Sequence, residues 1–358
     1  MRMSEIKSKL RKSVLVQLSK FKFMKFISVT LLVIVFLAAC QPKKSEYLKL
    51  SGFAQGSTYS ITYENSNNED YASDIDSILK AFDKSLSIYD SNSIISRINN
   101  DDPAVEADDW FIDVFNKSVE INSVSGGAFD ITVGPVVKAW GFANGPVAKH
   151  DRAHIDSLLQ FVGMDKVKLE GRKVVRKYPG VKIDVNAIAQ GYSVDVVCDF
   201  FVKKGIKNYL VEIGGEVRGK GTNAKNKFWH IGIDKPSDGN MEPGKDLQAI
   251  IEINNKALAT SGNYRKFFVE NGIKYAHTID PKNGFPARNS LLSATVVCDD
   301  CMTADAYATA FMVLGVEKSK DLLQKLPGIE VYLVYSNQQG EYEVFFSEGM
   351  KKMIVEQK

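Results

Sequence analysis

The sequence predicts an α+β fold in which the sheets are mostly antiparallel. Helical and strand patterns are mixed along the chain, whereas a doubly wound parallel sheet would need them to alternate one by one. Several strand patterns also follow one another with short connections, which favours an antiparallel meander. With 358 residues, the chain is long enough for one large domain or for two.

The spacing of apolar residues predicts each element in turn. A hairpin is expected over 47–63, with its turn at Gln55-Gly56-Ser57, and a helix over 71–88. A second helix over 109–124 ends before Gly126-Gly127. Further helices are expected over 154–162, 186–204, 303–314 and 318–325. Further strands are expected over 167–175, 180–185, 208–213, 216–219, 229–234, 247–253, 256–260, 293–298, 329–336 and 342–346.

The composition is that of an ordinary globular protein. It is 44% hydrophobic and 25% charged, which excludes collagen-like, disordered and many-span membrane classes. The net charge of +3 arises in residues 1–39, which hold eight basic residues and one acidic residue. The remainder keeps 38 of the 46 basic and 42 of the 43 acidic residues, a net charge of −4. This charge gives no reason to expect a nucleic-acid partner.

Residues 1–39 are interpreted as an export signal. The uncharged run 26–39 is shorter than the roughly 20 residues of a membrane span, and it follows a basic flank. The site Leu37-Ala38-Ala39-Cys40 resembles a bacterial lipoprotein signal, in which the cysteine is lipidated and becomes the N-terminus. The alternative is an uncleaved anchor with an incidental cysteine. We therefore expect an exported protein, lipid-anchored to a bacterial membrane and facing the periplasm or the outer surface.

The mature chain then begins with a short tether. Residues 40–46 comprise the lipidated cysteine and this tether, and the folded domain is expected over 47–350. Met24 offers an alternative start that gives a signal of normal length, so that 1–23 would be a mis-assigned start.

Three further cysteines, Cys198, Cys298 and Cys301, leave their redox state open. The last two form C-D-D-C, for which a local disulfide and two unpaired thiols are both compatible with an exported protein. A zinc site would need two more ligands at suitable spacing. A thioredoxin-like role would require the Cys298–Cys301 pair to lie at the start of a helix in a βαβ unit.

The segment Asp184-Val-Asn-Ala-Ile-Ala-Gln-Gly191 is the first candidate for chemistry. A strand pattern ends at Asp184, and a helix begins two or three residues later. The N-terminus of a helix suits a phosphate group, and the small Ala187 and Ala189 leave room for a ligand to approach the backbone. The alternative is an ordinary strand-to-helix turn with Asp184 as its cap.

The segment Asp305-Ala-Tyr-Ala-Thr309 is the second candidate. Asp305 and Thr309 are four residues apart in a predicted helix and therefore share one face. Carboxylate and hydroxyl oxygens suit Mg²⁺, which also takes phosphate oxygens of a substrate. The alternative is an acidic residue near a helix N-terminus and a threonine bonded to its own helix.

Two further stretches are weaker on their own. The segment 277–284 ends in a Pro/Asn-Gly turn and begins with His277 on an expected strand, although a lone histidine is more often structural. Aromatic residues lie beside glycines in 127–135 and 140–142. They are compatible with a sandwich around a planar ring and equally with a core turn.

Together these segments resemble the ApbE-type FAD:protein FMN transferases over about residues 50–335. Each motif is weak alone, but eight occur in the family's order. They are Gln55-Gly-Ser-Thr-Tyr59, Ser87-Ile-Tyr89 with Ser93-Ile-Ile-Ser-Arg-Ile-Asn99, Gly127-Ala-Phe-Asp130 with Gly134-Pro135 and Trp140-Gly-Phe142, Asp184 to Gly191, Gly214-Gly-Glu216, Thr260-Ser-Gly-Asn-Tyr264, His277-Thr-Ile-Asp-Pro281 and Ala304-Asp-Ala-Tyr-Ala-Thr309.

The resemblance implies a two-lobed α+β fold with the ligand site between the lobes. It also implies Mg²⁺-dependent transfer of FMN from FAD to a threonine or serine hydroxyl of exported or membrane acceptors, such as membrane respiratory subunits, with release of AMP. The implied metal ligands are Asp305, Thr309 and the main-chain oxygen of Ala187. The implied FAD contacts are Gln55, Tyr89, Ala128, Phe129, Asp130, Asp184, Gln190, His277, Thr278 and Ile279.

Two positions depart from the family's pattern. Gln55 stands where the family usually has methionine before its first Gly-Thr, and Gln190 stands where many members have lysine. A glutamine still donates hydrogen bonds to a pyrophosphate, but it leaves more of the charge neutralisation to Mg²⁺.

His277 and Asp305 are the candidate bases for the acceptor hydroxyl. Asp305 would be a poor base as a ligand, because a metal lowers its pKa, so His277 or a water on the metal is expected instead. Three alternatives remain: hydrolysis of FAD to FMN and AMP at the same site, a flavin-binding lipoprotein without chemistry, and a solute-binding lipoprotein. The two parallel lobes expected of the last do not occur in the sequence pattern.

Overall fold

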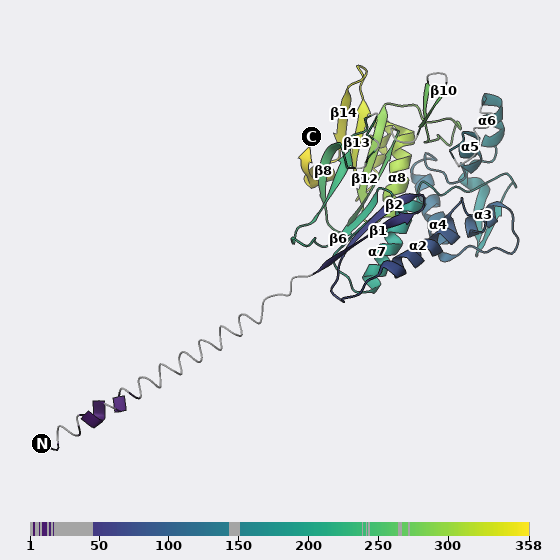
Figure 1. Cartoon of the computed structure of the whole chain (residues 1–358). Helices are drawn as coiled ribbons and strands as arrows, with labels where there is room; N and C mark the ends of the chain where they lie inside the picture. The colour runs from purple at the N-terminus through teal and green to yellow at the C-terminus, as the bar shows by residue number, and fades with distance from the viewer. Residues whose placement is uncertain are drawn as a thin grey trace. The chain divides into compact units, whose positions relative to one another are not determined.

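An eight-stranded antiparallel sheet forms the centre of the body (Figure 1). The computed structural model describes residues 46–142, 151–237, 239–240, 242, 244–263, 267–270 and 273–357, with scattered helical residues between 3 and 17. The strands follow the order β1 (Tyr47–Ala54), β2 (Ser57–Glu64), β5 (Tyr209–Ile213), β6 (Glu216–Lys220), β9 (Lys256–Gly262), β12 (Leu291–Cys298), β13 (Glu330–Ser336) and β14 (Tyr342–Phe346). Residues 46–358 belong to one compact unit.

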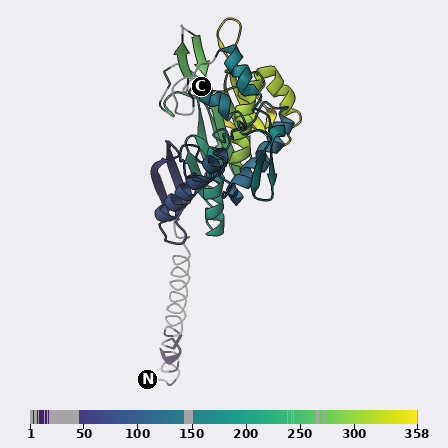
Figure 2. The same cartoon turned by 90° about the vertical axis from the view of Figure 1, so that its right-hand side faces the viewer.

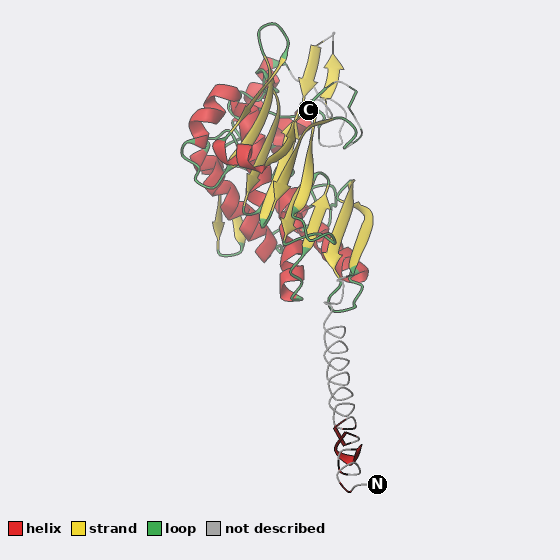
Figure 3. Cartoon of the chain, turned by 90° about the vertical axis from the view of Figure 1, so that its left-hand side faces the viewer, coloured by secondary structure: helices red, strands yellow, loops and turns green. Residues whose placement is uncertain are grey.

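Helices cover one face of this sheet, and Figure 3 shows most of them gathered on that side. The helix α8 packs on β9 and β12 and also contacts α7 and α4, and α2 packs on α7. The helices are α2 (Ala72–Leu86), α3 (Ile94–Asn99), α4 (Asp109–Val124), α5 (Gly134–Ala139), α6 (Arg152–Leu159), α7 (Ala189–Lys203), α8 (Cys301–Leu314), α9 (Val316–Leu323) and α10 (Glu348–Met353), with a short 3₁₀ helix η1 (Met164–Lys166).

A second, three-stranded sheet covers the other face. Its order is β15 (Ile354–Gln357), β8 (Leu247–Ile253) and β7 (Trp229–Asp234). Side chains alternate across a strand, so Ala259 and Val296 join the core under the helices, whereas their neighbours Leu258 and Val297 join the core under the small sheet. Both faces of the central strands are therefore buried.

Most of the predicted elements are confirmed. The hairpin turns at Gln55-Gly56, and α4 has the predicted bounds 109–124. The region 167–175 is instead a tight hairpin, with β3 (Val167–Glu170) and β4 (Lys173–Arg176) on either side of Gly171. The positive φ of Gly171 allows that turn.

The predicted strand over 180–185 is wrong. The structure has only an isolated bridge between Lys182 and Val133 there. The side chain of Asn99 accepts from the Ile183 N–H and donates to the Ile183 carbonyl, both at 2.8 Å. A side chain thus supplies the hydrogen bonds that a neighbouring strand would otherwise have provided.

Several elements were not predicted. They include α3, α5, α10, β15 and a hairpin of β10 (Phe267–Glu270) and β11 (Ile273–Ala276), which lies at the top of the view in Figure 2. His277, expected on a strand, follows directly after β11. Among the described residues, no helix has both the length and the apolar character needed to cross a membrane.

Candidate active site at the junction of two helices

The start of α7 lies directly against α8. The Gly191 N–H donates to the Asp305 Oδ2 at 3.0 Å, although 114 residues separate the two in the chain. Gly191 has no space for a side chain, because a Cβ there would lie 2.8 Å from the Asp305 Cβ and closer still to the Cys301 carbonyl oxygen. A glycine at this position is therefore what allows the two helices to meet so closely.

The same hydrogen bond takes a donor that could otherwise bind the Ala187 carbonyl. In a regular helix the Gly191 N–H would donate to the carbonyl of Ala187, four residues earlier. Here Asp305 takes that donor, and no backbone N–H of the described residues bonds to the Ala187 carbonyl. The Asp305 carboxylate of α8 therefore contacts the first turn of α7 at Gly191, four residues after Ala187.

Asp305 is a buried carboxylate. Burial raises its pKa to about 7, and the only opposing effect is the hydrogen bond from Gly191. Among the described residues, no basic side chain contributes to this shift. Thr309 lies one turn later on the same face of α8, with its Oγ1 3.2 Å from the Ser261 Oγ. This donor set of carboxylate, hydroxyl and carbonyl oxygens is the chemistry that Mg²⁺ prefers.

The two predicted glutamines share one hydrogen-bonded network. The Ser193 hydroxyl contacts both the Gln55 Oε1, at 3.1 Å, and the Gln190 carbonyl, at 2.7 Å. The Gln55 Nε2 is buried without a partner among the described residues. The Gln190 side chain lies against Gly214, where a Cβ would collide with it. The β1–β2 turn and the β5–β6 turn therefore both meet the start of α7.

Tyr89 and Asp184 form the next part of the surface. The Tyr89 hydroxyl accepts from the Asn186 Nδ2 at 3.1 Å, and the Asn186 N–H donates to the Asp184 Oδ1 at 2.9 Å. Burial raises the pKa of Asp184, with the Asn186 N–H opposing it, and burial together with the nearby Asp184 charge raises the pKa of Tyr89. Tyr89 is 55% exposed, so its ring is available to a ligand.

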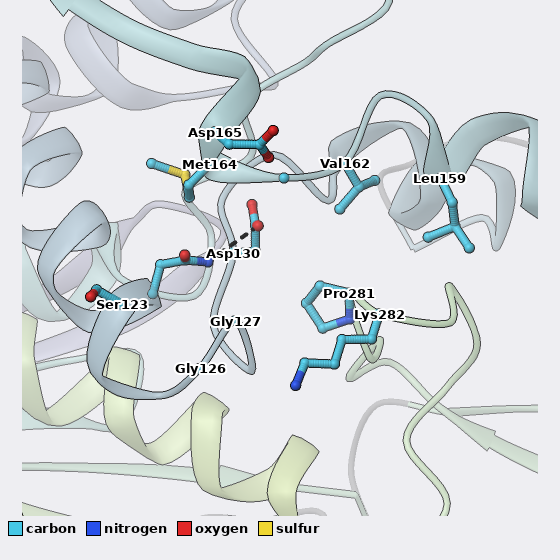
Figure 4. A pocket seen from close by; sticks show the side chains of 12 residues that line it. Ser123, Gly126, Gly127, Asp130, Leu159, Val162, Met164, Asp165, Pro281 and Lys282 are labelled. Atoms are coloured by element: carbon cyan, nitrogen blue, oxygen red, sulfur yellow. Dashed lines mark hydrogen bonds between the residues drawn. The ribbon is translucent and has the colours of Figure 1, made fainter.

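Asp130 lines the wall of a cavity of about 550 Å³. Figure 4 shows its carboxylate on one side, with Pro281 and Lys282 on the other. Burial raises the pKa of Asp130, against hydrogen bonds from Thr132 and Asn122 among others. None of the predicted metal ligands lines this cavity, which lies on the Asp130 side of the candidate site.

The preceding residues Ala128 and Phe129 are buried, and Phe129 packs in the core under the helices. Its ring therefore belongs to a core turn. Trp140 is also buried and donates from its Nε1 to the Gly284 carbonyl at 2.8 Å, which favours the core-turn interpretation of this aromatic stretch as well.

The segment 277–279 borders the same region. Thr278 and Ile279 are buried, whereas His277 is half-buried with its ring 6.3 Å from that of Phe142. The Ala287 N–H donates to the Thr278 carbonyl at 2.8 Å and holds this strip in place. Pro281 follows it and reaches the Asp130 cavity.

Sequence reasoning missed several residues that hold the site together. They are Asn99, Asn122, Asn186, Ser193 and Ser261. Each is a small polar residue inside or near a recognised motif. Four of them bond to a partner far away in the chain, whereas Asn122 bonds to Phe129 and Asp130, seven and eight residues later. A sequence pattern does not show which partner each of these side chains bonds to in the folded chain.

The three cysteines of the body are unpaired and buried. This confirms the alternative in which Cys298 and Cys301 are two unpaired thiols. The Cys298 Sγ donates to the Asp300 carbonyl instead, at 3.1 Å. Cys40 lies outside the described residues, as does Tyr264 of the predicted motifs.

Comparison with known proteins gives a consistent result. The chain is 36% identical over 320 residues to an FAD:protein FMN transferase of Haemophilus influenzae, covering 85% of this chain and 90% of the relative. It is 37% identical over 301 residues to one of Vibrio cholerae, covering 81% and 88%.

Solved structures agree with this. The flavin transferase ApbE from Vibrio cholerae has a TM-score of 0.78 at 33% identity, covering 86% of this chain and 99% of that one. The apo form of a flavinyl transferase ApbE from Pseudomonas stutzeri has a TM-score of 0.77 at 29% identity, covering 87% and 98%. These likenesses confirm the predicted α+β fold. The model of the ApbE family matches residues 55–333, and this chain belongs to the ApbE family.

Proposed function

We propose that this chain transfers FMN from FAD to a threonine or serine hydroxyl of an acceptor protein and releases AMP. Support comes from its family, and from relatives with this activity in their names that match over most of both chains. The observation that carries the proposal is the α7–α8 junction, where the buried Asp305 carboxylate accepts from the Gly191 N–H at the start of α7.

The residues present fit a divalent cation. A buried carboxylate without a compensating charge is costly, and a cation would remove that cost. The Asp305 carboxylate, the Thr309 hydroxyl and the Ala187 carbonyl would hold Mg²⁺. The hydrogen bond from the Gly191 N–H already orients the Asp305 carboxylate. When bound, Mg²⁺ would neutralise negative charge on the pyrophosphate of FAD.

The residues around the junction would bind and orient FAD. Gln55 brings a buried amide donor, and Gln190 a second amide, near the helix start that suits a phosphate. Tyr89 offers an exposed ring beside Asp184. The segments 128–130 and 277–279 would form the opposite border.

The reaction balances as a phosphoryl-type transfer. The acceptor oxygen forms a bond to the phosphorus of the FMN half, and the bond from that phosphorus to the bridging oxygen breaks. AMP leaves with the bridging oxygen, and the hydroxyl proton passes to a base. His277 is our candidate for this base, because its half-buried imidazole lies at the border of the site.

The leader suggests where the reaction takes place. Lipidation of Cys40 would anchor the protein at the surface of a bacterial membrane, outside the cytoplasm. Its acceptors would then be exported flavoproteins or membrane respiratory subunits with a threonine-containing segment.

One experiment tests the activity. The chain is mixed with FAD, Mg²⁺ and a threonine-bearing acceptor, and the acceptor is examined for flavin fluorescence after denaturing electrophoresis. A fluorescent acceptor together with AMP supports transfer. Free FMN with an unlabelled acceptor would show hydrolysis instead, and intact FAD would show a binding protein.

The metal assignment has its own test. Asp305→Ala is expected to abolish Mg²⁺-dependent transfer while some flavin binding remains. Unchanged turnover in this variant would remove the metal assignment. Asp108→Ala, at the N-cap of α4, serves as a control for loss of a carboxylate.

A further inference from the structure

Asp195 connects α7 to the first turn of α8. It lies one helical turn after Gly191, and its carboxylate accepts two backbone hydrogen bonds. The Cys301 N–H donates to Oδ1 at 3.0 Å, and the Met302 N–H donates to Oδ2 at 2.8 Å. A side chain from α7 therefore satisfies the free amides at the start of α8, which a helix leaves without partners of its own.

Arg218 of β6 holds Asp195 from the other side. Its Nη1 lies 2.7 Å from the Asp195 Oδ1, and the Asp195 side chain is only 8% exposed. Burial nevertheless raises the pKa of Asp195 to about 6, against the effects of Arg218 and the two amides. Because a buried pair of this kind adds little net stability, its value lies in the geometry that it imposes.

Two contacts one turn apart fix α8 relative to α7. In the first, the Gly191 N–H donates to the Asp305 carboxylate. In the second, the Asp195 carboxylate accepts from the backbone N–H groups of Cys301 and Met302. The packing of α8 on β9 and β12 already limits its movement, and these two contacts add a restraint where α8 meets the start of α7. The first contact orients the Asp305 carboxylate directly, and the Ala187 carbonyl lies four residues before Gly191.

We propose that Asp195, held by Arg218, is a positioning residue that sets the separation of Asp305 from the Ala187 carbonyl and thereby the affinity for a divalent cation. This inference rests on the proposed metal site. Asp195 touches neither the metal nor the substrate. It acts through the backbone of α8.

The test compares Asp195→Asn with the unaltered full chain in detergent. Binding of Mn²⁺ is followed through the electron paramagnetic resonance signal of the free ion, and the FMN transfer rate is measured against Mg²⁺ concentration. We expect the dissociation constant of Mn²⁺ and the half-saturating Mg²⁺ concentration to rise about tenfold. The rate at saturating Mg²⁺ should change little, because the metal ligands themselves are intact.

Asp108→Asn is the matched control. Asp108 caps α4 by accepting from the Phe111 N–H at 2.9 Å, and its side-chain partners, Ser85 and Phe111, belong to neither α7 nor α8. This variant should lose stability while its metal affinity stays the same. An equal weakening of metal binding in both variants would show a general structural effect and overturn the proposal.

Arg218→Gln covers the case in which Asp195→Asn does not fold. It removes the ion pair and leaves the Asp195 carboxylate in place, so we expect a smaller loss of Mn²⁺ affinity in the same direction. Unchanged Mn²⁺ affinity in either folded variant overturns the proposal. If the unaltered chain binds Mn²⁺ but transfers no FMN, the proposed function fails, and Mn²⁺ binding alone still decides the role of Asp195.

Discussion

Replacing Gly191 by alanine tests whether the close approach of α7 and α8 creates the site. The new Cβ would lie 2.8 Å from the Asp305 Cβ, whereas ordinary contact begins at 3.4 Å, and it would lie closer still to the Cys301 carbonyl oxygen. Backbone cannot move aside as a flexible side chain does, so the helices must separate by about 1 Å. A displacement of that size is expected to slow transfer about 100-fold. Overpacking should also cost about 1–3 kcal/mol of the free energy of unfolding.

The assay measures FMN transfer to an acceptor together with urea unfolding. Gly232→Ala is the control, because the nearest atoms to a Cβ there belong to the Leu247 side chain, at 2.7 Å, in the small sheet. It should lose stability without losing activity. A transfer rate for Gly191→Ala equal to that of the unaltered chain would refute the reasoning, as would equal losses in both variants.

Four further predictions rest on the described contacts. Burial raises the pKa of Asp305 to about 7, so below that pH a cation must displace a proton from its carboxyl group. The half-saturating Mg²⁺ concentration should therefore rise about tenfold per pH unit below about 7. A half-saturating concentration that does not change with pH would contradict this. The folded chain without metal then binds more protons than the unfolded chain between pH 3.8 and about 7, so its stability should fall as pH rises through that window, and Asp305→Asn should remove the fall in urea titrations. Asn99→Ala removes the side chain that bonds to the N–H and carbonyl of Ile183, and we expect it to lower the free energy of unfolding by about 2–4 kcal/mol. It should also weaken FAD binding, because Asp184 is the next residue. An unchanged affinity for FAD would contradict this prediction. Burial raises the pKa of Cys298 to about 12, so mass spectrometry should find it alkylated by iodoacetamide only after unfolding, and rapid labelling of the native chain would be inconsistent with the structure.

Local periodicity accounts for much of the fold. The bounds of α4 and the first hairpin agree with the apolar spacing, because the pattern over a few turns or residues determines which face is buried. The strand predicted over 180–185 shows the limit of this reasoning. Its apolar residues are buried as expected, but Asn99 provides the hydrogen bonds in place of a second strand.

The sequence alone determined the types of most elements, the order of the motifs and the chemical character of the donor set. An acid and a hydroxyl four residues apart in a helix share a face whatever surrounds them. Only the tertiary structure decided that Asp305 reaches Gly191, that Ser193 joins Gln55 to Gln190, and that Asp195 holds the start of α8. These contacts join segments far apart in the chain, and their geometry depends on how whole helices pack, which no local pattern encodes.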